Sequence, residues 1–155
     1  MANILTQHIG YNLLIQGGNM KREILFRAKF FGSWRYGSYV HFDKKPTHNC
    51  YNCNYKDFIV TNEEYGEHYY PITELSSIGQ YVGLEDHKGV RLFEGDILES
   101  RGERFVIEYS NDLAALFAYN TKYPNRLFMI EKRWVNGYNK MVIIGNVTDN
   151  PELIK

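Results

Sequence analysis

The sequence predicts a mostly β protein, and three observations lead to this fold class. From residue 23 onward, apolar and polar side chains alternate with a period of two, as they do in half-buried strands. The alternating segments are short and evenly spaced, and none of them is a long amphipathic helix. Glycine, asparagine and aspartate stand between them, where turns need these residues. About ten short strands at this spacing are typical of a small barrel or sandwich.

The first two strands are predicted to form a hairpin. The first strand places Phe26 and Ala28 on one side and Arg27 and Lys29 on the other. After a glycine turn, residues 34–42 alternate aromatic and apolar side chains with other residues. The hairpin is therefore expected to have a mostly apolar face and a partly basic face.

The remaining elements follow in order along the chain, each bounded by a turn. Expected strands lie at residues 55–61, 69–72, 78–82, 90–93, 97–100, 103–109, 113–119, 126–132 and 142–147. The Asn136-Gly137 dipeptide predicts a further hairpin. Residues 73–77 fit either one helical turn or none. Asn150 before Pro151 predicts the cap and the first residue of one short C-terminal helical turn.

Two boundaries divide the chain. Residues 1–19 are expected to be a translated leader, because the residues before Met20 can be back-translated into a purine-rich ribosome-binding sequence just upstream of a start codon. The alternative is a genuine N-terminal segment with a Gly-Gly turn. The second boundary separates an N-terminal β subdomain, residues 20–75, from a C-terminal β unit, residues 76–155.

The charges balance over the whole chain but not along it. Lysine plus arginine and aspartate plus glutamate both number 18, which argues against a uniformly basic nucleic-acid binder and against an acidic disordered tail. Residues 21–45 nevertheless carry a net charge of +5, and residues 56–108 carry −7. These charges either lie on solvated strand faces or let a basic face meet an acidic one, within the chain or between copies. No apolar run approaches the roughly 20 residues of a membrane span.

Candidate metal ligands occur around one CxxC pair. They are Cys50, Cys53, His41 and His48. A structural zinc site takes four such ligands, and a second cysteine pair is missing from this sequence, although dimerisation could complete a shared site. We therefore expect free thiols in a reducing cytoplasm, and neither a metal nor another cofactor.

Acidic side chains gather at three predicted turns. They are Glu63, Glu64, Glu67, Glu85, Asp86, Glu94 and Asp96. Carboxylates that are buried together bind Mg²⁺ or transfer protons, whereas carboxylates in turns are commonly solvated. The sequence also has no P-loop, GxSxG or HExxH motif, so we expect a protein that is not an enzyme.

A basic and aromatic set of residues supports the main alternative function, nucleic-acid binding. It comprises Arg27, Lys29, Arg35, Tyr39, Lys132, Arg133, Trp134, Tyr138 and Lys140. Small barrels bind nucleic acids through such side chains on one face. The zero net charge, however, leaves little capacity to neutralise phosphates. Trp134 also has a simpler interpretation as a core or interface aromatic residue.

One segment resembles a known family. Residues 78–98, with the sequence IGQYVGLEDHKGVRLFEGDIL, resemble the core motif of the YopX family, small proteins that phages and prophages encode. Residues 20–28 resemble the start of that family, and residues 142–147 with Asn150 and Pro151 resemble its end. The resemblance implies a mostly β protein with a C-terminal barrel similar to SH3-type barrels. It implies no reaction, and a fold alone does not supply one.

The residues that carry this resemblance are interpreted as mainly structural. They are Gly79, Gln80, Tyr81, Gly83, Leu84, Gly89, Glu94, Gly95, Asp96, Gly145, Asn146, Asn150 and Pro151. The glycines stand where strands bend or reverse, and the Asp96 carboxylate can accept a neighbouring backbone N–H in its turn. The alternative is a ligand site built on Gln80, Tyr81 and Asp96.

These observations together predict a non-enzymatic phage or prophage accessory protein that acts through protein contacts in the bacterial cytoplasm. A weak nucleic-acid-binding module is the alternative. Aromatic residues make up 15% of the chain, more than one small core holds, and strand edges need partners. We therefore also expect a homo-oligomer.

Overall fold

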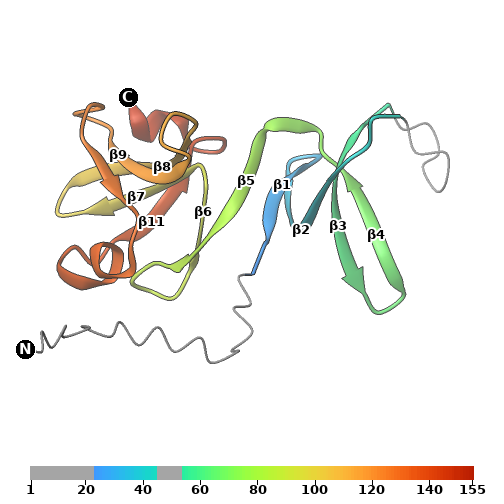
Figure 1. Ribbon diagram of the computed structural model, residues 1–155, viewed down its shortest axis with the longest axis horizontal. Coiled ribbons are helices and arrows are strands. Elements are labelled where there is room, and N and C mark those ends of the chain that lie inside the picture. Colours follow the sequence, from blue (N-terminus) through green and yellow to red (C-terminus); the bar gives the residue numbers. More distant parts are fainter. Residues whose placement is uncertain (1–22, 45–53) are drawn as a thin grey trace, which may run out of the picture.

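The computed structural model describes residues 23–44 and 54–155 and contains two antiparallel sheets (Figure 1). The first sheet has the strand order β4-β3-β2-β1-β5-β6, and the second has the order β10-β9-β8-β7-β11. The predicted mostly β class is therefore confirmed. Within the described residues neither sheet closes on itself, so the hydrogen bonding leaves the SH3-like barrel of the C-terminal unit unconfirmed.

Eleven strands make up the two sheets. In the first sheet they are β1 (Phe26–Phe30), β2 (Ser33–His41), β3 (Asp57–Glu63), β4 (Gly66–Pro71), β5 (Glu74–Glu85) and β6 (Arg91–Phe93). In the second sheet they are β7 (Asp96–Ser100), β8 (Glu103–Ser110), β9 (Ala115–Asn120), β10 (Leu127–Met129) and β11 (Val142–Asn146).

The long strand β5 links the two halves of the molecule (Figure 1). It pairs with β1 and β6 in the first sheet, while Val82 and Leu84 from its second half pack against the core of the second. The strand begins earlier than predicted, because Glu74 pairs with Lys29 of β1 and the Ser77 hydroxyl accepts the Lys29 N–H. The predicted boundary after residue 75 thus falls inside β5.

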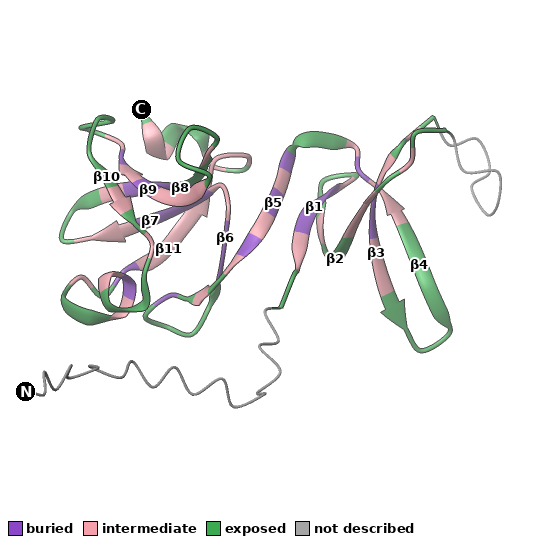
Figure 2. Ribbon diagram, in the orientation of Figure 1, coloured by how far each residue is buried: buried purple, intermediate pink, exposed green. Residues whose placement is uncertain are grey.

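Each half of the molecule has its own cluster of buried apolar side chains, and Figure 2 colours buried residues purple in both halves. The larger cluster lies in the second half and consists of Leu92, Leu98, Phe105, Ile107, Ala118, Val135 and Met141. The smaller cluster lies on the first sheet and consists of Ala28, Ile59 and Ile72. The first sheet therefore has less apolar burial to support it than the second.

Two local predictions in the C-terminal half need correction. The predicted hairpin at residues 136–137 is wrong, since η1 (Trp134–Tyr138) is a short π-helical turn. This turn buries Val135 completely, which a solvent-exposed hairpin tip would not do. The predicted C-terminal turn exists as the 3₁₀ helix η2 (Pro151–Ile154), but the Asn150 side chain does not cap it. The Asn150 Oδ1 accepts the Asn146 N–H instead.

Some predictions concern residues that the structure does not describe. The proposed leader 1–19, the start at Met20, and the candidate ligands His48, Cys50 and Cys53 lie outside the described ranges. Among the described residues, no helix is long and apolar enough to span a membrane.

Candidate functional site

The pairing of β1 with β2 brings cations and aromatic rings onto one face of the first sheet. Arg27 lies opposite Tyr36, and Lys29 lies opposite Trp34. Residues opposite each other in an antiparallel pair share a face. The predicted separation into an apolar and a basic face is therefore wrong, because the register places these aromatic side chains beside the cations.

Arg27 lies between the two halves of the molecule. Its guanidinium carbon is 4.7 Å from the centre of the Trp34 ring and 5.0 Å from that of Phe93. Its Nη2 lies 2.6 Å from Asp96 Oδ1 and donates to the Glu94 carbonyl at 3.2 Å. Stacking of a guanidinium between two rings is favourable, and more so when water is excluded.

Asp96 is the buried partner of this cation, with 1% of its surface exposed. Its Oδ2 accepts the Phe93 N–H at 2.7 Å, which confirms the predicted backbone contact in the turn. Burial raises the pKa of Asp96 above its ordinary value, while Arg27 and the Phe93 N–H act in the opposite direction. The carboxylate therefore depends on Arg27 to remain charged in this position.

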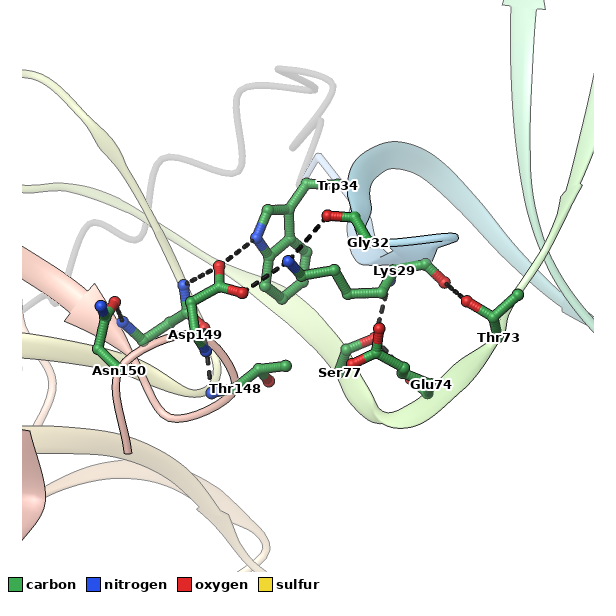
Figure 3. A network of polar contacts seen from close by, with 10 residues as sticks. Lys29, Gly32, Trp34, Thr73, Glu74, Ser77, Thr148, Asp149 and Asn150 are labelled. Atoms are coloured by element: carbon green, nitrogen blue, oxygen red, sulfur yellow. Dashed lines mark hydrogen bonds and ion pairs between the residues drawn. The ribbon is translucent and has the colours of Figure 1, made fainter. Parts of the chain in front are cut away.

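A second network, shown in Figure 3, joins the same two halves. The Lys29 Nζ lies 2.6 Å from Asp149 Oδ1 and donates to the Gly32 carbonyl. The Trp34 Nε1 donates to Asp149 Oδ2 at 2.7 Å. The hydrogen bond from Lys29 is the main reason why the pKa of Asp149 falls to about 2.

These two networks form the inter-sheet contact, defined by Arg27, Lys29, Trp34, Phe93, Asp96 and Asp149. The expectation that basic residues near the N-terminus meet acidic residues within the chain holds for Arg27 with Asp96. Lys29 pairs with an acidic residue of the C-terminal segment instead.

Several motif residues lie beside the inter-sheet contact. A Cβ on Gly79 would stand 2.4 Å from the Glu94 carbonyl oxygen, so only glycine permits this approach of β5 to the turn after β6. Gly95 has a φ of +83°, which favours glycine, and its carbonyl accepts the Val147 N–H. Asn146 Oδ1 accepts two backbone N–H groups of the next turn. In this structure Gly79, Gly95 and Asn146 each fix a backbone position beside the inter-sheet contact.

The alternative ligand site on Gln80, Tyr81 and Asp96 is not assembled. An open hollow of about 400 Å³ beside the inter-sheet contact is lined by Asp96 but by neither of the other two. Tyr81 is buried, and its ring lies near Phe93 and the Arg91 guanidinium. The Gln80 carbonyl accepts the Glu94 N–H.

The expectation that the acidic turn residues are solvated is wrong for Asp86 and Asp96, which are both buried. Asp86 Oδ1 accepts the backbone N–H groups of Lys88 and Val90, and its Oδ2 accepts that of Ile143. With three backbone donors, the Asp86 carboxylate fixes the turn before β6 against β11. The sequence did not predict this structural role.

The structure also divides the basic and aromatic set. Arg27 and Lys29 are buried in ion pairs, and the Arg35 guanidinium lies over the Tyr70 ring. Trp134 packs against core rings, which agrees with its simpler interpretation. The exposed members that remain together at the second half are Lys132, Arg133, Tyr138 and Lys140.

His41 is the one candidate metal ligand that the structure describes. Its Nδ1 lies 2.7 Å from Asp57 Oδ1, which also accepts the Tyr39 hydroxyl. That hydrogen bond raises the pKa of Tyr39 to about 12. Among residues 23–44 and 54–155, no three histidine, cysteine, aspartate or glutamate side chains are grouped as metal ligands.

Sequence reasoning missed a groove on the face of the first sheet, here called the β2–β3 groove. It has a volume of about 460 Å³ and is lined by Ile24, Leu25, Tyr36, Gly37, Ser38, Val40, Val60, Thr61, Asn62, Glu67 and Tyr69. The alternation of Tyr36, Ser38 and Val40 was the available signal. It showed that these side chains share a face, but not that the described part of the chain leaves this face uncovered.

The geometry defines an all-β protein with two antiparallel sheets, in which the long strand β5 of the first sheet also packs on the core of the second and buried cations join the two halves. The model of the YopX family, described as YopX protein, matches residues 25–155, so this chain belongs to the YopX family. Protein EF1440 from Enterococcus faecalis has a similar crystal structure, with a TM-score of 0.51 and 20% identity. The match covers 86% of this chain and 99% of that one and shows likeness of fold alone. No curated protein matched.

Proposed function

We propose that the protein is a non-enzymatic accessory protein that acts by binding another protein chain through the β2–β3 groove. One observation carries this proposal: apolar and aromatic side chains line an open groove on a sheet face. Tyr36 and Tyr69 are each 48% exposed there. Exposed tyrosines on a concave surface that is lined by both apolar and polar side chains are typical of protein interfaces.

The polar residues of the groove restrict what it binds. Glu67 and Asn62 lie at the end nearest the β3–β4 turn, and the Tyr69 hydroxyl donates to Glu67 at 2.9 Å. A segment that places an apolar or aromatic side chain on Val40 and Val60 and a cation near Glu67 fits this lining. The groove therefore favours a partner segment that is both aromatic and basic.

The proposal includes a phage or prophage origin and action in the cytoplasm of the bacterial host without a cofactor. Membership of the YopX family supports the origin. We also propose that the second sheet, β6 and the end of β5 follow the path of an SH3-like barrel. The packing of Val82, Leu84 and Leu92 on the second core supports that path.

A photo-crosslinking experiment tests the groove. Benzoylphenylalanine replaces Ser38, which is exposed in the groove, and in a matched control it replaces Leu113, which is 56% exposed on the second half. After irradiation of phage-infected host cells, we expect a protein adduct from position 38 and none from position 113. Absence of any protein adduct at position 38 would contradict the proposal.

Nucleic-acid binding is the second candidate function, and one observation favours it. Lys132, Arg133, Tyr138 and Lys140 are all exposed and lie within one short segment of the chain, residues 132–140. If this surface binds single-stranded DNA or RNA, retention on an immobilised oligonucleotide falls steeply with salt. Replacing Lys132 and Arg133 together by glutamate would then abolish retention.

A further inference from the structure

One surface of the second half, here called the basic turn, combines a prominent aromatic ring with four cations. It consists of Arg101, Lys132, Arg133, Tyr138 and Lys140, and all five side chains are exposed. Tyr138 is 77% exposed, the largest exposed fraction of any aromatic side chain on this half. Glu131 is the acidic residue next to this set in the sequence. An exposed ring among cations is complementary to a groove that has apolar side chains along its floor and a glutamate at one end.

The backbone holds the basic turn in a defined shape. The Arg101 Nη2 donates to the Tyr138 carbonyl at 3.0 Å, and the Asn139 side chain donates to the Trp134 carbonyl. Arg101 and Lys140 both have a positive φ, +53° and +47°, a conformation that costs free energy for residues other than glycine. Tyr138 is therefore presented by a constrained turn rather than by a loose loop.

From these two surfaces we propose that the β2–β3 groove of one copy binds the basic turn of a second copy, with Tyr138 as the anchor. This inference rests on the proposed function, since it names the partner of the groove. The aromatic and basic segment that the groove favours is present in this same chain. Glu67 would attract Lys132 and Arg133 of the bound copy, and Val40 and Val60 would contact the ring.

The two surfaces lie too far apart in the fold for one chain to bind its own turn. In Figure 1 the orange segment that contains residues 132–140 of the basic turn lies in the lobe of the second sheet, whereas β2 and β3 lie on the opposite side of β5. Contact between two different surfaces is heterologous, so copies add head to tail. The zero net charge of the chain allows this, because copies do not repel each other at long range.

Light scattering of the full chain over a range of concentration and salt tests the proposal. We expect an average mass that rises above 18.2 kDa with concentration and falls again at high salt, where exposed charges are screened. Tyr138→Ser and, separately, Glu67→Lys should each weaken association by about tenfold or more. Tyr123→Ser, a change at a 44% exposed tyrosine outside both surfaces, should leave association unchanged.

A mixing experiment distinguishes this contact from any other. The Tyr138→Ser variant keeps an intact groove, and the Glu67→Lys variant keeps an intact basic turn. Equal amounts of the two variants should therefore form a dimer that does not grow further. All substituted side chains are exposed, and circular dichroism confirms that each variant is folded.

Three results would overturn the inference. A mass of 18.2 kDa for the wild type at every condition would do so, and so would association that neither variant weakens. A monomer that instead binds an oligonucleotide through Lys132 and Arg133 would assign the basic turn to nucleic acid. In each case a crosslink from position 38 to a different protein would still support the proposed function of the groove.

Discussion

Several residues of this protein fix the position of the backbone around them. Asp86 receives three backbone N–H groups, Asn146 receives two, and Gly79 leaves room for the Glu94 carbonyl. Asp149 accepts from Lys29 and Trp34, more than 100 residues away in the chain. Few other amino acids can replace these residues, because each contact needs a hydrogen-bonding atom, or an empty space, at one particular place.

Gly79→Ala tests the close approach of β5 to residue 94. The new methyl group would collide with a backbone oxygen, which a flexible side chain cannot relieve, so we expect a loss of about 2–3 kcal/mol in the free energy of unfolding. Urea denaturation provides the measurement. Ser76→Ala, on the exposed part of the same strand, is the control and should change it by less than about 0.5 kcal/mol. Equal effects of the two changes would contradict the steric argument.

Asp149→Asn tests the second network through pH. The folded-state pKa of Asp149 is about 2 and lies below its ordinary value of 3.8, so its ionisation stabilises the fold above pH 4. This stabilisation is lost as the pH falls from about 4 to 2. We expect the wild type to be more stable than the variant at pH 7 and the two to converge near pH 2. A difference in unfolding temperature that is independent of pH would count against this role.

At the scale of elements, β1 is the strand on which both halves depend. Its even-numbered side chains Phe26 and Ala28 lie in or against the smaller cluster, and its odd-numbered cations reach the second half. The strand therefore supports the first sheet with one face and joins it to the second with the other. Because Arg27 and Asp96 are both buried, loss of either leaves a charge without its partner.

A double-mutant cycle on Arg27 and Asp96 measures that coupling. Arg27→Met or Asp96→Leu alone should cost about 3–5 kcal/mol of unfolding free energy, because each leaves an unpaired buried charge. The double variant should recover a large part of that loss. Thermal and urea denaturation of all four proteins give the coupling energy. Additive losses would show that the two charges do not depend on each other.

At the scale of the whole molecule, two clusters of unequal size share one strand. Side chains of β5 pack on both clusters, Val82 and Leu84 on the larger one and Ile78 on the smaller one. A sheet with so little burial gains stability from the larger half. The two halves are therefore expected to unfold together.

The two tryptophans report on this cooperativity. Trp34 lies at the inter-sheet contact and Trp134 packs on the second core, and the chain has no others. In each single-tryptophan variant, made by Trp134→Phe or Trp34→Phe, fluorescence and far-ultraviolet circular dichroism should give the same urea midpoint. A Trp34 signal that changes at lower urea than the circular dichroism would show that the first sheet unfolds separately.

The sequence alone determined the features that depend on near neighbours. Alternation within each strand established the β class, and the Asp96 carboxylate reaches the Phe93 N–H because the two residues share one turn. The YopX motif was likewise recognisable in one continuous segment. These features involve residues that are only a few positions apart. The local sequence is therefore sufficient to predict them.

Only the tertiary structure determined which strand faces pack against each other. A shift of one residue in the pairing of β1 with β2 would replace Tyr36 and Trp34, opposite Arg27 and Lys29, by residues of the other face of β2. Alternation within each strand does not specify that register. The burial of Asp86 and the pairing of Lys29 with Asp149 depend on chain segments 57 and 120 residues away. The β2–β3 groove exists because no described element covers that part of the first sheet, a property of the assembled fold rather than of any strand.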